Sequence, residues 1–98
     1  MDLGIDLGTS EVKAVLVDEA QAIVGQAHAA VHVSRPQPLW SEQDPQEWWR
    51  AICAALAELR EQHPKAYGAV RGIGLSGQMH GATLLDAQRR VLRPAILW

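Results

Sequence analysis

The sequence contains almost no cysteine and no long apolar run. Cys53 is the only cysteine among the 98 residues, so neither a disulfide within the chain nor a cysteine cluster for metal can form. The longest apolar run, residues 51–57, is far shorter than a membrane span. Residues 1–3 lack the basic segment and apolar core of a secretion signal. We therefore expect a soluble protein of the cytoplasm.

The sequence also lacks a concentration of positive charge. Nine Lys and Arg residues stand against eleven Asp and Glu residues, which gives a formal net charge of -2, and the basic residues are scattered. This pattern provides no electrostatic footprint for nucleic acid or for an anionic membrane, so neither is expected as a partner. A chain of this length forms about one domain, with roughly 65% of its surface buried on folding.

The apolar pattern at the start of the chain predicts a small antiparallel sheet. Apolar and polar or small residues alternate over residues 3–7 and again over residues 12–17, with a short polar connection at residues 8–10. A second turn at residues 18–21 leads to a longer alternating segment, residues 23–33. Three strands with such short connections predict an antiparallel meander.

A helix and a crossover are predicted next. Two prolines, Pro36 and Pro38, make the connecting segment extended or turned. Asp44, Pro45 and Glu47 form the start of a helix, with an N-cap acid, proline at the first position and glutamate at the third. Its apolar face carries Trp48, Ile52, Ala55, Leu56 and Leu59, and the helix is predicted to end at His63 and Pro64. A buried strand over residues 70–75 then completes half of a right-handed crossover, and residues 82–86 and 93–98 are predicted to form a hairpin.

One motif in this region is misleading. Residues 72–77, GIGLSG, match the G-x-G-x-x-G pattern of dinucleotide-binding proteins. That fingerprint requires the glycines between a strand and a helix, with an acid about 20 residues later. Here the glycines lie within the predicted strand, and no carboxylate follows Asp86. Close packing of backbones is the favoured interpretation.

The first strand and its turn carry the strongest chemical signal. Asp6 stands in an apolar strand, and Gly8, Thr9 and Ser10 follow it, with Lys13 on the next strand. Backbone N–H groups and hydroxyls of such a turn can bind phosphate oxygens, and the carboxylate can hold Mg²⁺ directly or through water. The alternative is that Asp6 caps the turn and Lys13 is a solvated strand residue. Spacing alone does not choose between these interpretations.

A resemblance favours the phosphate site. The segment GIDLGTSEVKAVLVD resembles the first phosphate motif of the sugar kinase, actin and heat-shock chaperone ATPase superfamily. The segments RPQPLWSEQDPQEWW and GLSGQMHGATLLDAQRRVLRPAILW resemble the amino-terminal part of xylulokinases, within the FGGY carbohydrate kinases. The resemblance implies an α/β protein with an incomplete ribonuclease H-like (actin-like ATPase) fold: antiparallel three-strand meander, helix, parallel strand and hairpin. It covers residues 1–98 as the front of an N-terminal domain whose C-terminal partner domain is absent.

The resemblance also implies an activity, which is transfer of phosphate from ATP, with Mg²⁺, to the 5-hydroxyl of D-xylulose. Asp6 corresponds to the metal-associated acid, and the cofactor-binding residues are Gly8, Thr9, Ser10 and Lys13. The residues that correspond to the sugar-binding pair are Met79 and His80. The family's general-base aspartate, second phosphate motif and adenosine motif would lie after Trp98, so the isolated chain is expected to be inactive and marginally stable. A homodimer is compatible with the resemblance for the full-length protein.

Several alternatives stay open at this stage. A gluconokinase-like enzyme is the nearest rival substrate class, and a non-catalytic α+β module that binds a partner strand at its open sheet edge is a different class. The tryptophans are also assigned to two different roles. Trp48 is predicted to pack in the core, whereas Trp40 and Trp49 could stand at a substrate entrance.

Overall fold

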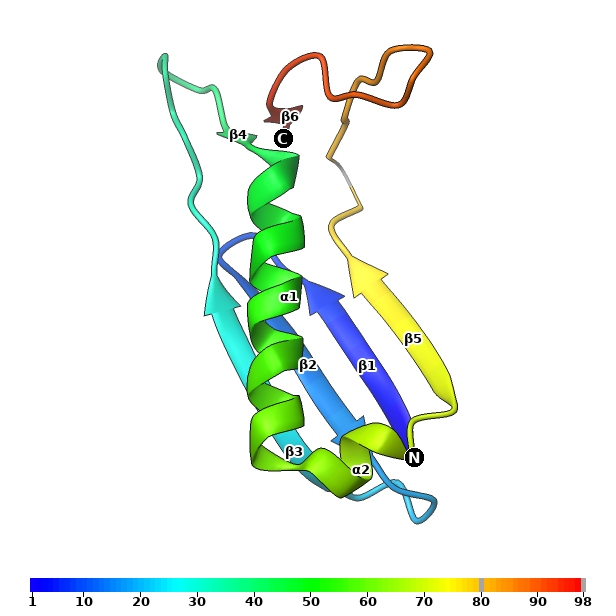
Figure 1. Cartoon of the computed structure of the whole chain (residues 1–98). Coiled ribbons are helices and arrows are strands. Elements are labelled where there is room, and N and C mark those ends of the chain that lie inside the picture. The colour runs from blue at the N-terminus through cyan, green and yellow to red at the C-terminus, as the bar shows by residue number, and fades with distance from the viewer. Residues whose placement is uncertain (80, 98) are drawn as a thin grey trace.

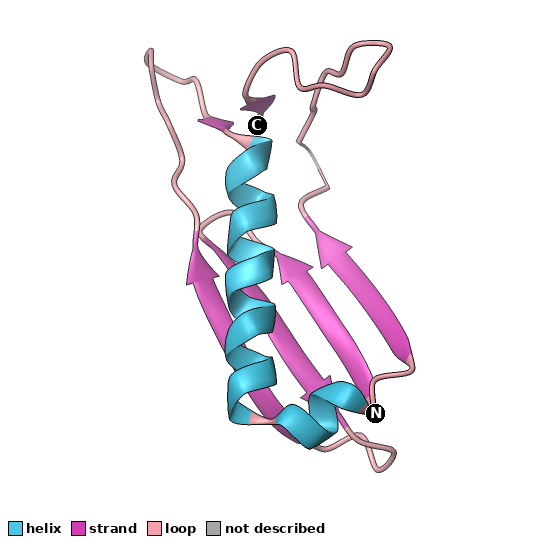
Figure 2. Cartoon of the chain, in the orientation of Figure 1, coloured by secondary structure: helices cyan, strands magenta, loops and turns pink. Residues whose placement is uncertain are grey.

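A four-stranded mixed sheet with one long helix against one face makes up most of the protein (Figure 1). The computed structural model describes residues 1–79 and 81–97. The strand order is β3-β2-β1-β5, so β1 and β2 lie in the interior of the sheet (Figure 2). The elements are β1 Asp2–Leu7, β2 Glu11–Val17, β3 Ile23–Ala30, β4 Glu42–Gln43, α1 Pro45–Gln62, α2 Pro64–Gly68, β5 Gly72–Gly77 and β6 Ala95–Ile96.

The predicted antiparallel meander is confirmed. β1 pairs with β2, with Leu3 opposite Leu16, and β2 pairs with β3, with Ala14 opposite Ala27. The third strand ends at Ala30 instead of residue 33, because Ala30 pairs with Glu11, the first residue of β2, and the Val31 N–H donates to Ser10 of the turn instead of to a strand.

The predicted crossover to a parallel strand is also confirmed, but the strand spans Gly72–Gly77 instead of residues 70–75, and it is mostly exposed instead of buried because α1 does not lie over it. β5 lies beside β1 in parallel, from Asp2 opposite Gly72 to Leu7 opposite Gly77. The strand therefore contains the whole G-x-G-x-x-G pattern. The close-packing interpretation is confirmed only in part, because a Cβ at Gly72 would lie 3.1 Å from Asp2 Oδ1, whereas a Cβ at Gly74 would meet nothing within 4 Å. The short helix α2 between α1 and β5 was not predicted; it begins at Pro64, which is suited to a first helical position.

Helix α1 forms the core with the first three strands. The Asp44 side chain caps it by accepting a hydrogen bond from the Gln46 N–H at 2.9 Å, as predicted. Ala51, Ala55 and Leu59 recur every four residues and are buried against the sheet. Their partners include Ala14, Leu16 and Ala27 in one cluster and Val12 and Val31 in another. The predicted residues Trp48, Ile52 and Leu56 flank this stripe and are partly buried.

Part of the sheet face beside α1 is not covered within the described residues. The parallel register places Ile73 and Leu75 on the same face as Leu3 and Ile5. The helix lies over β2 and β3, however, so the side chains of Ile73 and Leu75 are 63% and 79% exposed. None of the described helices is long and apolar enough to cross a membrane.

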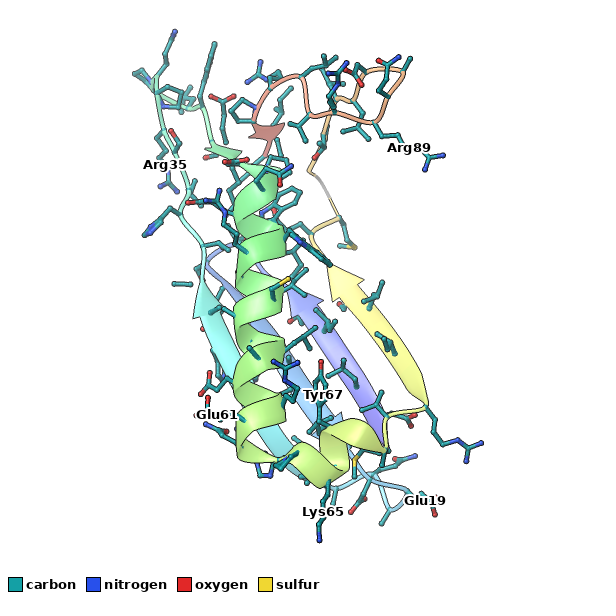
Figure 3. All side chains as sticks on the ribbon, in the orientation of Figure 1. Glu19, Arg35, Glu61, Lys65, Tyr67 and Arg89 are labelled. Carbon is teal, nitrogen blue, oxygen red and sulfur yellow. The ribbon has the colours of Figure 1, made fainter. Side chains whose placement is uncertain are left out.

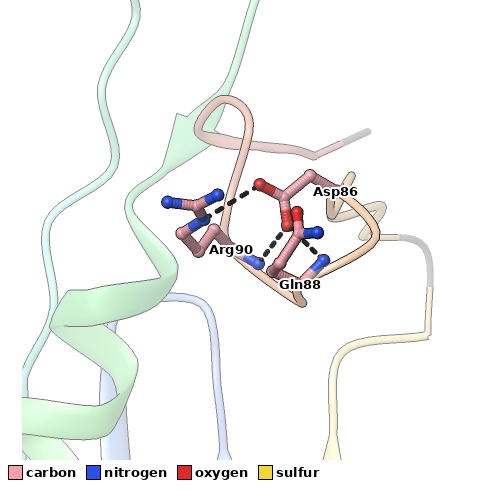
Figure 4. Close-up of polar contacts among 3 residues, drawn as sticks. All are labelled: Asp86, Gln88 and Arg90. Carbon is pink, nitrogen blue, oxygen red and sulfur yellow. Dashed lines mark hydrogen bonds and ion pairs between the residues drawn. The ribbon is translucent and has the colours of Figure 1, made fainter.

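The predicted hairpin near the end of the chain is present in a reduced form. Its turn is closed by Asp86, whose Oδ1 accepts hydrogen bonds from the N–H groups of Gln88 and Arg90, both at 2.8 Å (Figure 4). Only isolated antiparallel bridges connect its two arms, among them Ala82 with Ile96. β6 pairs with β4 instead, at the end of the helix where α1 begins (Figure 1).

Candidate functional site

The two predicted site segments meet at one edge of the sheet. β1 and β5 are parallel and in register, with Leu7 opposite Gly77. The turn at residues 8–10 and the segment that carries Met79 therefore both start at the carboxyl ends of neighbouring parallel strands. Ligands of open α/β sheets commonly bind at this edge.

The turn at residues 8–10 is tightly closed. The Gly8 N–H donates to the Glu11 carbonyl oxygen at 2.9 Å, and a Cβ at Gly8 would lie 2.9 Å from that same oxygen. This close approach is the reason that glycine is required at position 8. The backbone conformation is not the reason, because the φ angle of Gly8 is not positive. Within residues 1–79 and 81–97, the N–H groups of Thr9 and Ser10 have no hydrogen-bond partner. These two groups are available as donors to an anion.

A row of polar side chains crosses the sheet beside this turn. Asp6 is opposite Lys13 of β2 and Ser76 of β5, so all three share the face that points away from α1. Asp6 and Lys13 are both exposed. Together with Gly4 and Gly74 these residues line a shallow hollow of about 310 Å³. The two glycines leave this space open, because neither has a side chain that would fill it.

The position of Asp6 bears on the two interpretations of its carboxylate. In the described part of the chain, Asp6 accepts no hydrogen bond from the turn, as a capping role would require. An exposed carboxylate beside unpaired N–H groups suits a hydrated Mg²⁺, which is often held by one or two carboxylates together with substrate phosphates. No group of three His, Cys, Asp or Glu side chains that could hold a metal occurs among the described residues. One exposed carboxylate of this kind is a ligand set that fits a hydrated Mg²⁺ brought with a phosphate ligand.

Two glutamines support the turn, and the sequence did not single them out. Gln43 is 1% exposed, and its Nε2 donates to the Thr9 carbonyl oxygen at 2.5 Å. Its Oε1 accepts hydrogen bonds from Trp48 Nε1 and Gln78 Nε2, each at 2.9 Å. Gln78 Nε2 also lies 3.5 Å from the Gly8 carbonyl oxygen. Both carbonyl groups at the start of the turn are thus held by side-chain amides.

One atom of this network has no partner. Gln78 Oε1 is buried and makes no hydrogen bond among the described residues. A buried acceptor without a donor costs about 1–3 kcal/mol. The hydrogen bonds that Gln78 Nε2 donates to Gln43 Oε1 and to the Gly8 carbonyl oxygen hold the amide in this orientation.

A second hollow opens on the other side of the turn. It has a volume of about 420 Å³, and its lining includes Thr9, Arg35, Trp40 and Leu97. Arg35 projects from the segment that follows β3 (Figure 3). Trp40 is 48% exposed, so it remains a candidate for a substrate entrance beside Thr9.

The remaining predicted site residues are distributed as follows. Trp48 packs against the cluster around Val12 and Val31, which confirms its predicted packing role. Trp49 is largely exposed on α1 and does not line either hollow. Met79 is 88% exposed just after β5. His80 lies outside the described residues.

Comparison with known proteins gives a consistent result. The model of the "FGGY family of carbohydrate kinases, N-terminal domain" matches residues 1–98. The chain is 56% identical to the xylulose kinase of Escherichia coli K12 over 98 residues, which is 100% of this chain and 20% of that protein. A xyloylose kinase structure from Brucella ovis superposes with a TM-score of 0.97 at 65% identity, covering 99% of this chain and 20% of that one. The xylulose kinase from Rhodospirillum rubrum gives a TM-score of 0.93 at 35% identity, covering 98% and 20%. The chain thus spans about one-fifth of the length of these relatives.

Proposed function

Since the chain belongs to the FGGY family of carbohydrate kinases, we propose that the full-length protein phosphorylates D-xylulose at its 5-hydroxyl with ATP and Mg²⁺. The partial sheet and helix have the actin-like ATPase fold of these kinases, as expected from the sequence. Residues 1–98 would supply the front of the N-terminal domain. The observation that carries the proposal is the position of Asp6 next to a turn in which the N–H groups of Thr9 and Ser10 have no partner among residues 1–79 and 81–97.

Phosphoryl transfer depends mainly on positioning and on neutralising charge, and the turn and its neighbours are suited to both. The N–H groups of Thr9 and Ser10 would donate to oxygens of the transferred phosphate. Lys13 would place a positive charge on the same face of the sheet, next to Asp6. Asp6 would hold the hydrated Mg²⁺ that accompanies ATP and neutralises its phosphate charge.

The sugar is proposed to bind along the segment after β5. Met79 is exposed at the same sheet edge as the phosphate turn, and it would provide an apolar wall for the carbon chain. His80 would exchange hydrogen bonds with sugar hydroxyls. A bound sugar would then have its terminal hydroxyl near the turn, as transfer requires. We expect the enzyme to act in the cytoplasm and to bind a small sugar as its substrate, and we leave a homodimer as a hypothesis.

The experiment is a coupled ADP-release assay of the full-length protein with ATP and a panel of D-xylulose, gluconate and glycerol. We expect D-xylulose to give the highest kcat/KM. A higher kcat/KM for gluconate would replace the substrate assignment but keep the kinase. Absence of phosphorylation with every sugar in the presence of Mg²⁺ would overturn the proposal.

A further inference from the structure

We infer that Gln43 and Gln78 are positioning residues that couple the segment carrying Met79 to the turn at residues 8–10. The inference rests on the proposed function for its kinetic meaning. Its structural basis is independent of that function, because it consists of hydrogen bonds among described residues.

The chemistry of the partners fixes how both amides are oriented. Trp48 Nε1–H can only donate, so the Gln43 atom facing it must be Oε1. The Thr9 carbonyl can only accept, so the Gln43 atom facing it must be Nε2. Gln78 has acceptors on one side, Gln43 Oε1 and the Gly8 carbonyl oxygen, so its Nε2 must face them. Flipping either amide would bring oxygen against oxygen.

This chain of donors joins two parts of the site that are distant in sequence. Gln78 directly precedes Met79, and its amide reaches the turn in two ways: directly at the Gly8 carbonyl oxygen, and through Gln43, which donates to the Thr9 carbonyl oxygen. Gln43 is itself held by the ladder between β4 and β6, where it is opposite Ala95. A displacement of the Met79 segment therefore moves an amide that is anchored to the turn.

The test uses three variants of the full-length protein. Gln43→Glu keeps the size and the acceptor for Trp48, but it removes the donor to Thr9. Gln78→Met keeps the length of the side chain and removes its donors. Gln88→Glu is the matched control, since Gln88 is exposed in the hairpin turn (Figure 4).

The first readout is amide hydrogen exchange without any ligand. The Gly8 N–H donates to Glu11 and the Val31 N–H donates to the Ser10 carbonyl oxygen at 3.0 Å, so both report closure of the turn. We expect exchange at these two amides to be at least about tenfold faster in Gln43→Glu and Gln78→Met, and unchanged in Gln88→Glu. Unchanged exchange in folded Gln43→Glu would overturn the inference. If Gln43→Glu does not fold, Gln78→Met decides by the same criterion.

The second readout is steady-state kinetics with D-xylulose and ATP. We expect Gln43→Glu to lower kcat at least about tenfold with the sugar KM within about threefold. Gln78→Met should lower kcat and also raise the sugar KM, because it disturbs both segments. The double variant should lose no more kcat than the worse single variant, since both changes break one chain of bonds. Multiplicative losses would refute the coupling. An inactive wild-type protein would instead refute the proposed function, and exchange at Gly8 in Gln78→Met would still judge the coupling.

Discussion

Replacing Gly8 by alanine tests whether the tight closure of the first turn controls phosphoryl transfer. The added Cβ would lie 2.9 Å from the Glu11 carbonyl oxygen, whereas ordinary contact begins at 3.4 Å, so the two must separate by about 0.5 Å (3.4 − 2.9). This separation strains the hydrogen bond from the Gly8 N–H to the same oxygen. Crowding of this kind costs about 1–3 kcal/mol.

The effect on activity follows from the same displacement. A misplacement of about 1 Å can cost roughly 100-fold in rate, so a shift of half that size corresponds to about tenfold if the cost grows exponentially with distance. We therefore expect Gly8→Ala in the full-length protein to lower kcat about tenfold, with the sugar KM nearly unchanged.

The assay is the coupled measurement of kcat and KM with D-xylulose, together with thermal unfolding. Gly68→Ala is the control, since a Cβ there meets nothing within 4 Å and Gly68 ends α2, which lies at the opposite end of the sheet (Figure 1). Equal kcat for Gly8→Ala and wild type would refute the reasoning that the turn must keep this geometry.

Four further changes test the site and the core. Asp6→Asn should lower kcat at least about 100-fold, or roughly 2.7 kcal/mol, with little change in the sugar KM, and a kcat within threefold of wild type would contradict its role. His80→Ala should raise the sugar Kd, measured by calorimetry, more than it raises the KM for ATP. A larger effect on the KM for ATP would move His80 out of the sugar site. Leu59→Ala should destabilise the protein by about 2–5 kcal/mol in urea unfolding, since Leu59 is fully buried, and a loss below about 1 kcal/mol would mean that its cavity collapses. Asp44→Ala should lower the free energy of unfolding, measured by the same urea unfolding, by about 1 kcal/mol through loss of the helix cap, while Asp44→Asn should lower it much less.

The main elements could be predicted because their signals are local. Alternation of apolar residues over β1 and β2 depends only on which sheet face is buried, and the start of α1 depends on Asp44 and Pro45 next to it. The strand ends were less predictable. The end of β3 depends on its pairing with Glu11 of β2. The apolar periodicity within β3 carries no information about that pairing.

The parts that could not be predicted depend on contacts between distant residues. β4 and β6 have two residues each, which is too short for any period to be read. Gln43 stands 34 positions from Thr9, and nothing in its local sequence distinguishes a glutamine that holds a turn from one that is solvated. By contrast, the meeting of the Asp6 turn with the Met79 segment could be expected once β1 and β5 were taken as parallel neighbours.

The pairing of β1 with β5 has a consequence for how the protein is made on the ribosome. β1 is an inner strand of the finished sheet, yet its partner at Gly72–Gly77 is translated only after the whole helix. The 47 residues between Ala30 and Gly77 (77 − 30) take roughly 2–10 s to synthesise at typical elongation rates. Throughout that interval the nascent meander presents β1 as a bare edge, open to pairing with a neighbouring chain on the same messenger RNA. Translation speed across the helix therefore sets how long β1 stays an unpaired edge.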